Sequence, residues 1–210
     1  MTARPFDVIA FDLGNVLSIV NERPAARALA QMSGAHENEV LERVFGPERK
    51  APMETGRETW SEFTAAAASA LNIDLAESEL LQLYQSVLSP NEPIFPLVEQ
   101  LAPAYRIALC SNTSRVHWEH ERQRLPIAPL LDPVILSYEV GALKPATAIF
   151  QALASAAGAQ PDRILFIDDM GQNVSGARAA SLSAIQFTGV APLRRELAAL
   201  RVLSHPPPGR

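Results

Sequence analysis

The sequence predicts an α/β protein in which a doubly wound parallel sheet carries a small α-helical domain inserted after its first strand. Five short runs rich in apolar, β-forming residues are spread along the chain, and the last four alternate with helix-like stretches. That alternation is typical of a parallel sheet covered by helices on both faces. A long interval without a strand pattern follows the first run and predicts the inserted domain.

The predicted strands span residues 7–12, 106–111, 134–137, 163–168 and 184–187. Three of them end on a polar side chain that is followed by a turn: Asp12, Ser111 and Asp168. In an open α/β sheet the ligand crevice lies beyond the carboxyl ends of the strands. We therefore expect these three side chains to line a functional site.

The inserted domain is predicted to span residues 18–92, with helices near 24–32, 37–45, 58–71 and 77–87. The segments SGAH, GPERKAP and NIDLA are expected to separate these helices. Such an insert would lie over the crevice as a cap, or would serve only as a stabilising subdomain. Residues 1–17 and 93–203 are then the core domain, and the proline-rich tail 204–210 is expected to be unstructured.

Composition narrows the class of partner. The 210 residues carry a formal net charge of −5 and show no basic stripe, which argues against nucleic acid. No apolar run reaches the roughly 18 residues of a membrane helix, and no leader pattern opens the chain. The single cysteine, Cys110, cannot form an intramolecular disulfide. These features predict a cytoplasmic protein that associates with neither membrane nor nucleic acid.

The polar strand ends fit the needs of phosphoryl transfer, which are a nucleophile, donors for the phosphate oxygens, a cation and a divalent metal. Asp12 offers a carboxylate nucleophile. Ser111 and Asn112 offer a hydroxyl, an amide and backbone N–H groups before a predicted helix. Lys144, in GALKPA, offers the cation. Each feature alone also fits an ordinary turn or helix cap, so the prediction depends on their combination.

Adjacent acids follow the fourth predicted strand in FIDDMGQN. Two like charges at a strand end repel each other unless a cation offsets them. Asp168 and Asp169 offer the hard oxygen ligands that Mg²⁺ prefers. The sequence therefore predicts Mg²⁺ as cofactor.

In order along the chain, FDLGNV, SNTSR, LKP and FIDDMGQNVSGAR resemble the four motifs of the haloacid dehalogenase superfamily of phosphatases. The resemblance runs from about residue 9 to residue 187. It implies that Asp12 is the nucleophile and that Ser111 and Asn112 bind the transferred phosphate. It also implies that Lys144 pairs with both the phosphate and the nucleophile.

The same resemblance implies a metal site. The direct ligands would be Asp12, the backbone carbonyl of Gly14 and Asp169. The loop that carries them would be supported by two further residues, Asp168 and Asn173, that do not themselves bind the metal. FDLGNV together with SNTSRVH looks most like the sugar-phosphate phosphatases, notably the glucose-1-phosphate phosphatases. The implied activity is Mg²⁺-dependent hydrolysis of a small phosphorylated metabolite through an aspartyl-phosphate. Neither the physiological substrate nor the oligomeric state is encoded in a readable pattern.

Gly14 departs from the family pattern, which usually has a second aspartate there. That aspartate protonates the leaving oxygen and later activates the hydrolytic water, whereas glycine has no proton to give. If no other group replaces it, good leaving groups are favoured over simple alkyl phosphates. His117, about one and a half helical turns beyond the phosphate-binding turn, is the candidate surrogate acid and base. The alternative is a histidine that only packs on its helix.

Two other functions fit part of this pattern. A 2-haloacid dehalogenase shares the nucleophile and needs no acid to expel halide, but it has no use for a metal-binding acid pair. A non-catalytic protein that binds a phosphorylated ligand would keep the cradle without turnover. Turnover of an aryl phosphate with and without Mg²⁺ separates these functions.

Overall fold

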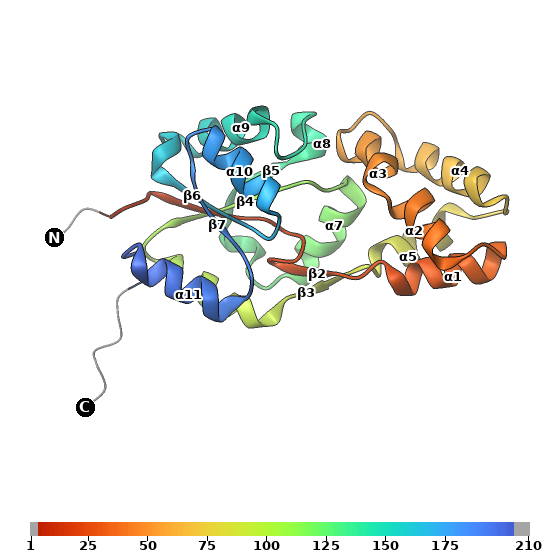
Figure 1. The fold of residues 1–210 in the computed structure, drawn as a ribbon, viewed down its shortest axis with the longest axis horizontal. Coiled ribbons are helices and arrows are strands. Elements are labelled where there is room, and N and C mark those ends of the chain that lie inside the picture. The colour runs from red at the N-terminus through yellow and green to blue at the C-terminus, as the bar shows by residue number, and fades with distance from the viewer. Residues whose placement is uncertain (1–3, 204–210) are drawn as a thin grey trace.

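The computed structural model describes residues 4–203. Five parallel strands form one sheet in the order β5-β4-β1-β6-β7 (Figure 1). Their bounds are β1 (Val8–Phe11), β4 (Arg106–Ser111), β5 (Leu131–Leu136), β6 (Ile164–Asp168) and β7 (Ser183–Gln186). The central strand is β1, in which Val8 pairs with Arg106 on one side and with Ile164 on the other. The predicted doubly wound parallel sheet is confirmed.

Alternate side chains of β1 supply the two halves of the hydrophobic core. Ile9 and Phe11 face one side with helices α6 (Phe95–Leu101) and α11 (Val190–Ala199). Val8 and Ala10 face the other side with α9 (Thr147–Ala157) and α10 (Gly171–Ala179). All four of these side chains are at most 1% exposed, so β1 is a strand covered on both faces. Burying a side chain such as Phe11 stabilises the fold by about 1.5–3 kcal/mol.

The third predicted strand is displaced in the structure. The strand β5 begins at Leu131, three residues before the predicted start at Val134. Ser137, predicted to end the strand, instead begins the short helix α8 (Ser137–Val140). Its hydroxyl accepts a hydrogen bond from the Thr113 amide at 3.0 Å and donates one to the Thr113 carbonyl at 3.1 Å. Ser137 is thus committed to holding the turn after β4.

Five helices form the inserted segment, on one side of the sheet in Figure 1. They are α1 (Arg23–Ser33), α2 (Glu37–Phe45), α3 (Pro47–Glu54), α4 (Trp60–Leu71) and α5 (Glu77–Gln85). They pack around their own apolar cluster, in which Phe45, Phe63 and Tyr84 are fully buried. A separate core of this kind fits a distinct unit, and we propose that it is the cap with the predicted bounds 18–92.

The expectation of a strand-free insert was wrong at both ends. Two short strands, β2 (Ser18–Val20) and β3 (Leu88–Pro90), pair antiparallel where the chain leaves the core and returns to it. Both linkers are fastened to helix α7 (Arg115–Arg124). The Ser18 hydroxyl donates to the Glu121 carboxylate at 2.5 Å, and Arg124 donates to the Leu88 carbonyl at 2.9 Å.

Helix α3 covers most of the segment GPERKAP, which the sequence predicts to be a separator between helices. Pro47 occupies the first turn of this helix, where its missing N–H costs nothing. Pro52 lies inside the helix and suggested a break, yet Met53 beside it is buried in the cap cluster. Tertiary packing therefore offsets the poor helix propensity of this segment.

The remaining elements are single 3-10 turns at Glu92–Ile94, Ala128–Leu130 and Pro161–Arg163. The tail 204–210, predicted to be unstructured, lies outside the described residues. Within the described part of the chain, no helix is both long and apolar enough to cross a membrane.

Candidate active site

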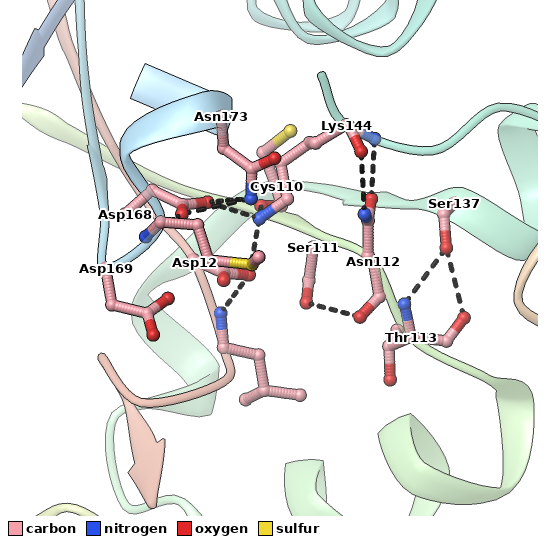
Figure 2. Close-up of polar contacts among 12 residues, drawn as sticks. Asp12, Cys110, Ser111, Asn112, Thr113, Ser137, Lys144, Asp168, Asp169 and Asn173 are labelled. Atoms are coloured by element: carbon pink, nitrogen blue, oxygen red, sulfur yellow. Dashed lines mark hydrogen bonds and ion pairs between the residues drawn. The ribbon is translucent and has the colours of Figure 1, made fainter. Parts of the chain in front are cut away.

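Asp12, Lys144 and Asp168 meet at the carboxyl ends of the central strands (Figure 2). The Lys144 ammonium lies 2.7 Å from Asp12 Oδ1 and 2.7 Å from Asp168 Oδ2, and it also donates to the Cys110 carbonyl at 3.1 Å. The Leu13 amide donates to the same Asp12 Oδ1 at 2.7 Å. Asp12 Oδ2 is therefore the oxygen left free of Lys144 and of this amide.

The electrostatics of this triad follow from burial and mutual charge. Asp12 is 7% exposed, and burial raises its pKa to about 7 against the opposing effect of the Lys144 charge. Burial alone would lower the pKa of Lys144, but the carboxylates of Asp12 and Asp168 raise it above its ordinary value. The lysine thus holds its positive charge between two acids.

Asp168 is fully buried, and both of its oxygens are occupied. Besides Lys144, it accepts hydrogen bonds from the Asn173 side-chain amide at 3.0 and 3.1 Å and from the Met170 backbone amide at 2.8 Å. These contacts tie the first turn of α10 to the end of β6. The arrangement fits a residue that orients Lys144, with Asn173 holding it in place.

Asp169 is placed differently, because its side chain is only partly buried. Asp169 Oδ2 accepts a hydrogen bond from the Asn15 side chain at 3.1 Å. Burial raises the pKa of this carboxyl, the Asn15 hydrogen bond lowers it and the Asp168 charge raises it. Oxygens of Asp12, Asp168 and Asp169 all lie within 4.8 Å of one another.

Asn15 is a site residue that the sequence reasoning passed over. It adopts a left-handed backbone conformation with φ of 54°, which asparagine tolerates better than most residues. Its side chain donates to Asp169 and accepts from the Val20 amide at 3.1 Å, so it links the acid to the start of the cap linker. The signal was present in the glycine–asparagine turn directly after β1.

The structure gives the Asn112 side chain another task than binding phosphate. Its amide donates to the Lys144 carbonyl at 3.0 Å, and its oxygen accepts from the Lys144 amide at 2.7 Å (Figure 2). This reciprocal pair fixes the backbone that carries the lysine. The Ser111 hydroxyl in turn donates to the Asn112 carbonyl at 3.4 Å. That Ser111 and Asn112 bind the transferred phosphate stays a prediction.

His117 lines a cavity between this site and the inserted helices, but it is a poor surrogate acid. Its Nε2 lies 2.8 Å from the Tyr84 carbonyl, which can only accept, so Nε2 carries the proton and donates it there. The ring also stacks on Tyr84 with centroids 4.1 Å apart. Burial lowers the pKa of His117 to about 3, although the bond to Tyr84 opposes this. A neutral, committed imidazole has no proton for a leaving oxygen, which corrects the expectation from sequence.

This burial predicts an acid-sensitive fold. The pKa of His117 is lower in the folded chain than the ordinary 6.5, so the unfolded chain binds more protons between these values. Its contribution to stability is complete above pH 6.5 and is lost as the pH falls toward 3. We expect the free energy of unfolding to fall by up to about 1.4 kcal/mol per pH unit in that window.

Urea unfolding between pH 7 and 5 measures this effect. His117→Gln removes the titrating ring and keeps an amide donor for Tyr84, so its stability should vary less with pH than that of the wild type. The exposed His36 is the matched control, since His36→Gln should keep the wild-type slope. Equal slopes for the wild type and His117→Gln would contradict the assignment.

A cavity of about 80 Å³ lies between this site and the cap. The core lines it with Gly14, Ser111, Asn112 and other residues of these turns, and the cap contributes three charged side chains: Glu22, Lys50 and Glu54. The sequence reasoning missed all three, because nothing in their spacing relates them to the four motifs. Two of them belong to α3, the helix that was also missed.

The chain matches the haloacid dehalogenase-like hydrolase family over residues 6–181. It is 24% identical over 196 residues to a D-ribitol-5-phosphate phosphatase from Bacteroides thetaiotaomicron, covering 90% of this chain and 95% of that protein. It resembles a solved family enzyme from the same organism, in complex with magnesium and inorganic phosphate, with a TM-score of 0.75 and 23% identity. That match covers 86% of this chain and 93% of the other.

The L-2-haloacid dehalogenase from Xanthobacter autotrophicus shares the fold as well, with a TM-score of 0.67 and 19% identity over 95% of this chain and 85% of that one. Fold similarity alone therefore does not separate the two chemistries. The family match spans most of the chain, and it includes all the motifs that converge on Asp12. This chain belongs to the haloacid dehalogenase-like hydrolases.

Proposed function

We propose that the protein is a Mg²⁺-dependent phosphatase that hydrolyses small phosphorylated metabolites, sugar or polyol phosphates in particular. The observation that carries this proposal is the cluster of Asp12, Asp168 and Asp169 around one lysine. Displacement of halide with the help of a lysine does not require the third acid, Asp169. A phosphatase can use that acid to bind a divalent metal beside the phosphoryl group. The ribitol-phosphate activity of the relative supports the substrate class.

Asp12 is the proposed nucleophile. Its Oδ2 attacks phosphorus, the bond from phosphorus to the leaving oxygen breaks, and an aspartyl-phosphate forms. Water then attacks phosphorus in line, releasing inorganic phosphate and restoring the carboxylate. Lys144 neutralises charge at the nucleophile and the phosphate, and the Ser111 hydroxyl donates to a phosphate oxygen. Asp168, Asn173 and the Asn112 side chain hold Lys144 at the required position.

The residues present fit Mg²⁺. The carboxylates of the three clustered acids can carry more negative charge than the single positive charge of Lys144 neutralises. Because the cluster is largely buried, the excess negative charge is unfavourable unless a further cation binds. Asp12, the Gly14 carbonyl and Asp169 would hold the ion, with Asp168 oriented toward Lys144. When bound, Mg²⁺ supplies charge neutralisation for the phosphoryl oxygens.

We expect chelation to stop turnover of p-nitrophenyl phosphate and added Mg²⁺ to restore it. Asp169→Ala should raise the Mg²⁺ concentration for half-maximal activity by more than tenfold, because a direct ligand is lost. Asp168→Ala should lower kcat with a smaller change in that concentration, because it acts through Lys144. Both are measured by Mg²⁺ titration of turnover and by calorimetric titration of Mg²⁺ into the protein.

The same assays separate the alternatives. Metal-independent release of halide from a 2-haloacid would establish a dehalogenase. Binding of inorganic phosphate without turnover of any phosphate ester would indicate a ligand-binding protein. An Asp169→Ala protein with an unchanged Mg²⁺ response would overturn the ligand assignment.

A further inference from the structure

The proposed reaction needs a proton at the leaving oxygen, and the described core offers no obvious donor. Gly14 has no side chain, and His117 is neutral and committed to Tyr84. Lys144 and Asp168 are locked in a buried ion pair. The donor must then come from the other wall of the cavity, which the cap provides.

The geometry of in-line attack places the leaving oxygen near the cap, so a cap residue is the better candidate for the proton donor. In-line attack by Asp12 leaves the departing oxygen on the side of phosphorus opposite the nucleophile. The cavity runs from Gly14 and Ser111 in the core to Glu22, Lys50 and Glu54 in the cap. A phosphate bound at Ser111 therefore directs its leaving group toward these cap side chains.

Of the two cap acids, Glu22 is already engaged. The Lys50 ammonium lies 2.7 Å from Glu22 Oε1 and donates a hydrogen bond to it. For Glu54, the last residue of α3, no hydrogen bond or ion pair of the side chain is found within residues 4–203. Glu54 is thus the cap carboxyl that is available to a ligand.

We propose that Glu54 is the general acid and base of the reaction, in place of the missing acid at position 14. This rests on the proposed phosphatase function. The Glu54 carboxyl gives its proton to the leaving oxygen as the bond from that oxygen to phosphorus breaks. The resulting carboxylate then takes a proton from the water that attacks the aspartyl-phosphate, which returns Glu54 to its starting state.

The surroundings of Glu54 support this role. Burial has the largest effect and raises its pKa, the Lys50 charge lowers it, the Glu22 charge raises it and the Lys144 charge lowers it. His117, which lines the same cavity from the core, is neutral and adds no charge. The balance keeps more of the carboxyl protonated near neutral pH than in an exposed glutamate, as a general acid requires.

Glu54→Gln tests the proposal with three substrates. Propyl phosphate has a poor leaving group and no hydroxyls, ribitol 5-phosphate has a poor leaving group and several hydroxyls, and p-nitrophenyl phosphate has a good leaving group. We expect kcat to fall about 10²- to 10⁴-fold on the first two and less than about threefold on the third. The alkaline decline of kcat for propyl phosphate should disappear in the variant. Glu48→Gln, exposed on the same helix, is the matched control and should match the wild type.

The outcomes distinguish the possible failures. Loss confined to ribitol 5-phosphate and expressed in KM would show that Glu54 binds hydroxyls, and unchanged rates on all substrates would remove it from the mechanism. Either result overturns the proposal. A wild-type protein that hydrolyses none of the three substrates overturns the phosphatase function instead. Retained activity on p-nitrophenyl phosphate shows that the variant is folded.

Gly14→Asp gives a test that does not depend on the Glu54 variant folding. The backbone of Gly14 is not in the left-handed region, and an added Cβ would meet only Val20 Cγ2 at 3.4 Å, which is an ordinary contact. With Glu54 as the acid, Gly14→Asp should restore propyl phosphate turnover in Glu54→Gln, because the added carboxyl supplies the missing proton. A gain of 10²-fold or more in the wild type would show that no acid was present and would overturn the proposal.

Discussion

Asp12→Asn is expected to lower turnover of every phosphate ester by roughly 10⁴-fold or more, because the amide cannot form the covalent intermediate. The side chain keeps an Oδ1 that still accepts from the Leu13 amide and from Lys144, both at 2.7 Å in the wild type. The fold should therefore survive. Steady-state turnover of p-nitrophenyl phosphate measures the loss of activity, and thermal unfolding of the same variant measures whether the fold is retained.

Asp7→Asn is a suitable control for this variant. Asp7 lies just before β1 and pairs with Arg163 at 2.7 Å on the surface, far from the chemistry along the strand. An exposed pair of this kind contributes little to stability, so activity should remain at the wild-type level. A fully active Asp12→Asn enzyme would remove Asp12 from the nucleophile role.

Lys144→Met is expected to have the largest effect on stability. The side chain is 1% exposed and lies between the carboxylates of Asp12 and Asp168. Methionine fills a similar volume but leaves two buried acids without their cation. Breaking a buried ion pair from one side costs about 3–5 kcal/mol, and turnover should be lost with it. Urea unfolding in the presence of a chelator measures the loss without compensation by Mg²⁺.

A second substitution identifies the cause of that loss. In Lys144→Met/Asp168→Asn, one of the two acids left without a cation is replaced by a neutral amide. The amide oxygen can still accept the hydrogen bond from the Met170 backbone amide. We expect the double variant to recover part of the stability lost in Lys144→Met, because the two residues are coupled. Additive losses would show instead that the lysine stabilises the fold through packing, for example over the Phe166 ring, 5.2 Å from its ammonium.

The sheet was predictable because its central strands β1, β4 and β6 are buried on both faces almost throughout and so form continuous apolar runs. The ends of those strands then identified Asp12, Ser111 and Asp168, which the structure brings into one region (Figure 2). The strands β2 and β3 are too short to give a pattern, and Pro52 concealed α3. These elements depend on contacts with distant parts of the chain, about which the local sequence carries little information.

The site, like the fold, was predictable only in part from the sequence. Motif order predicted that Lys144 and the paired acids belong with Asp12, but it could not show how each hydrogen bond is used. The Asn112 amide binds backbone, and His117 is buried against Tyr84. Glu54 lies near the site only because the cap folds back over the core, so its position is a property of the tertiary structure.

The central place of β1 has a consequence for how the protein folds. Val8 must find Arg106 on one side and Ile164 on the other, so both neighbours of the nucleophile strand are distant in the chain. The cap helices, by contrast, pack mainly against others within the same inserted segment. Contacts between distant segments carry a larger loop-closure cost and slow folding. Asp12 therefore reaches its final surroundings only when both β4 and β6 are in place, so we expect the reactive centre to assemble late.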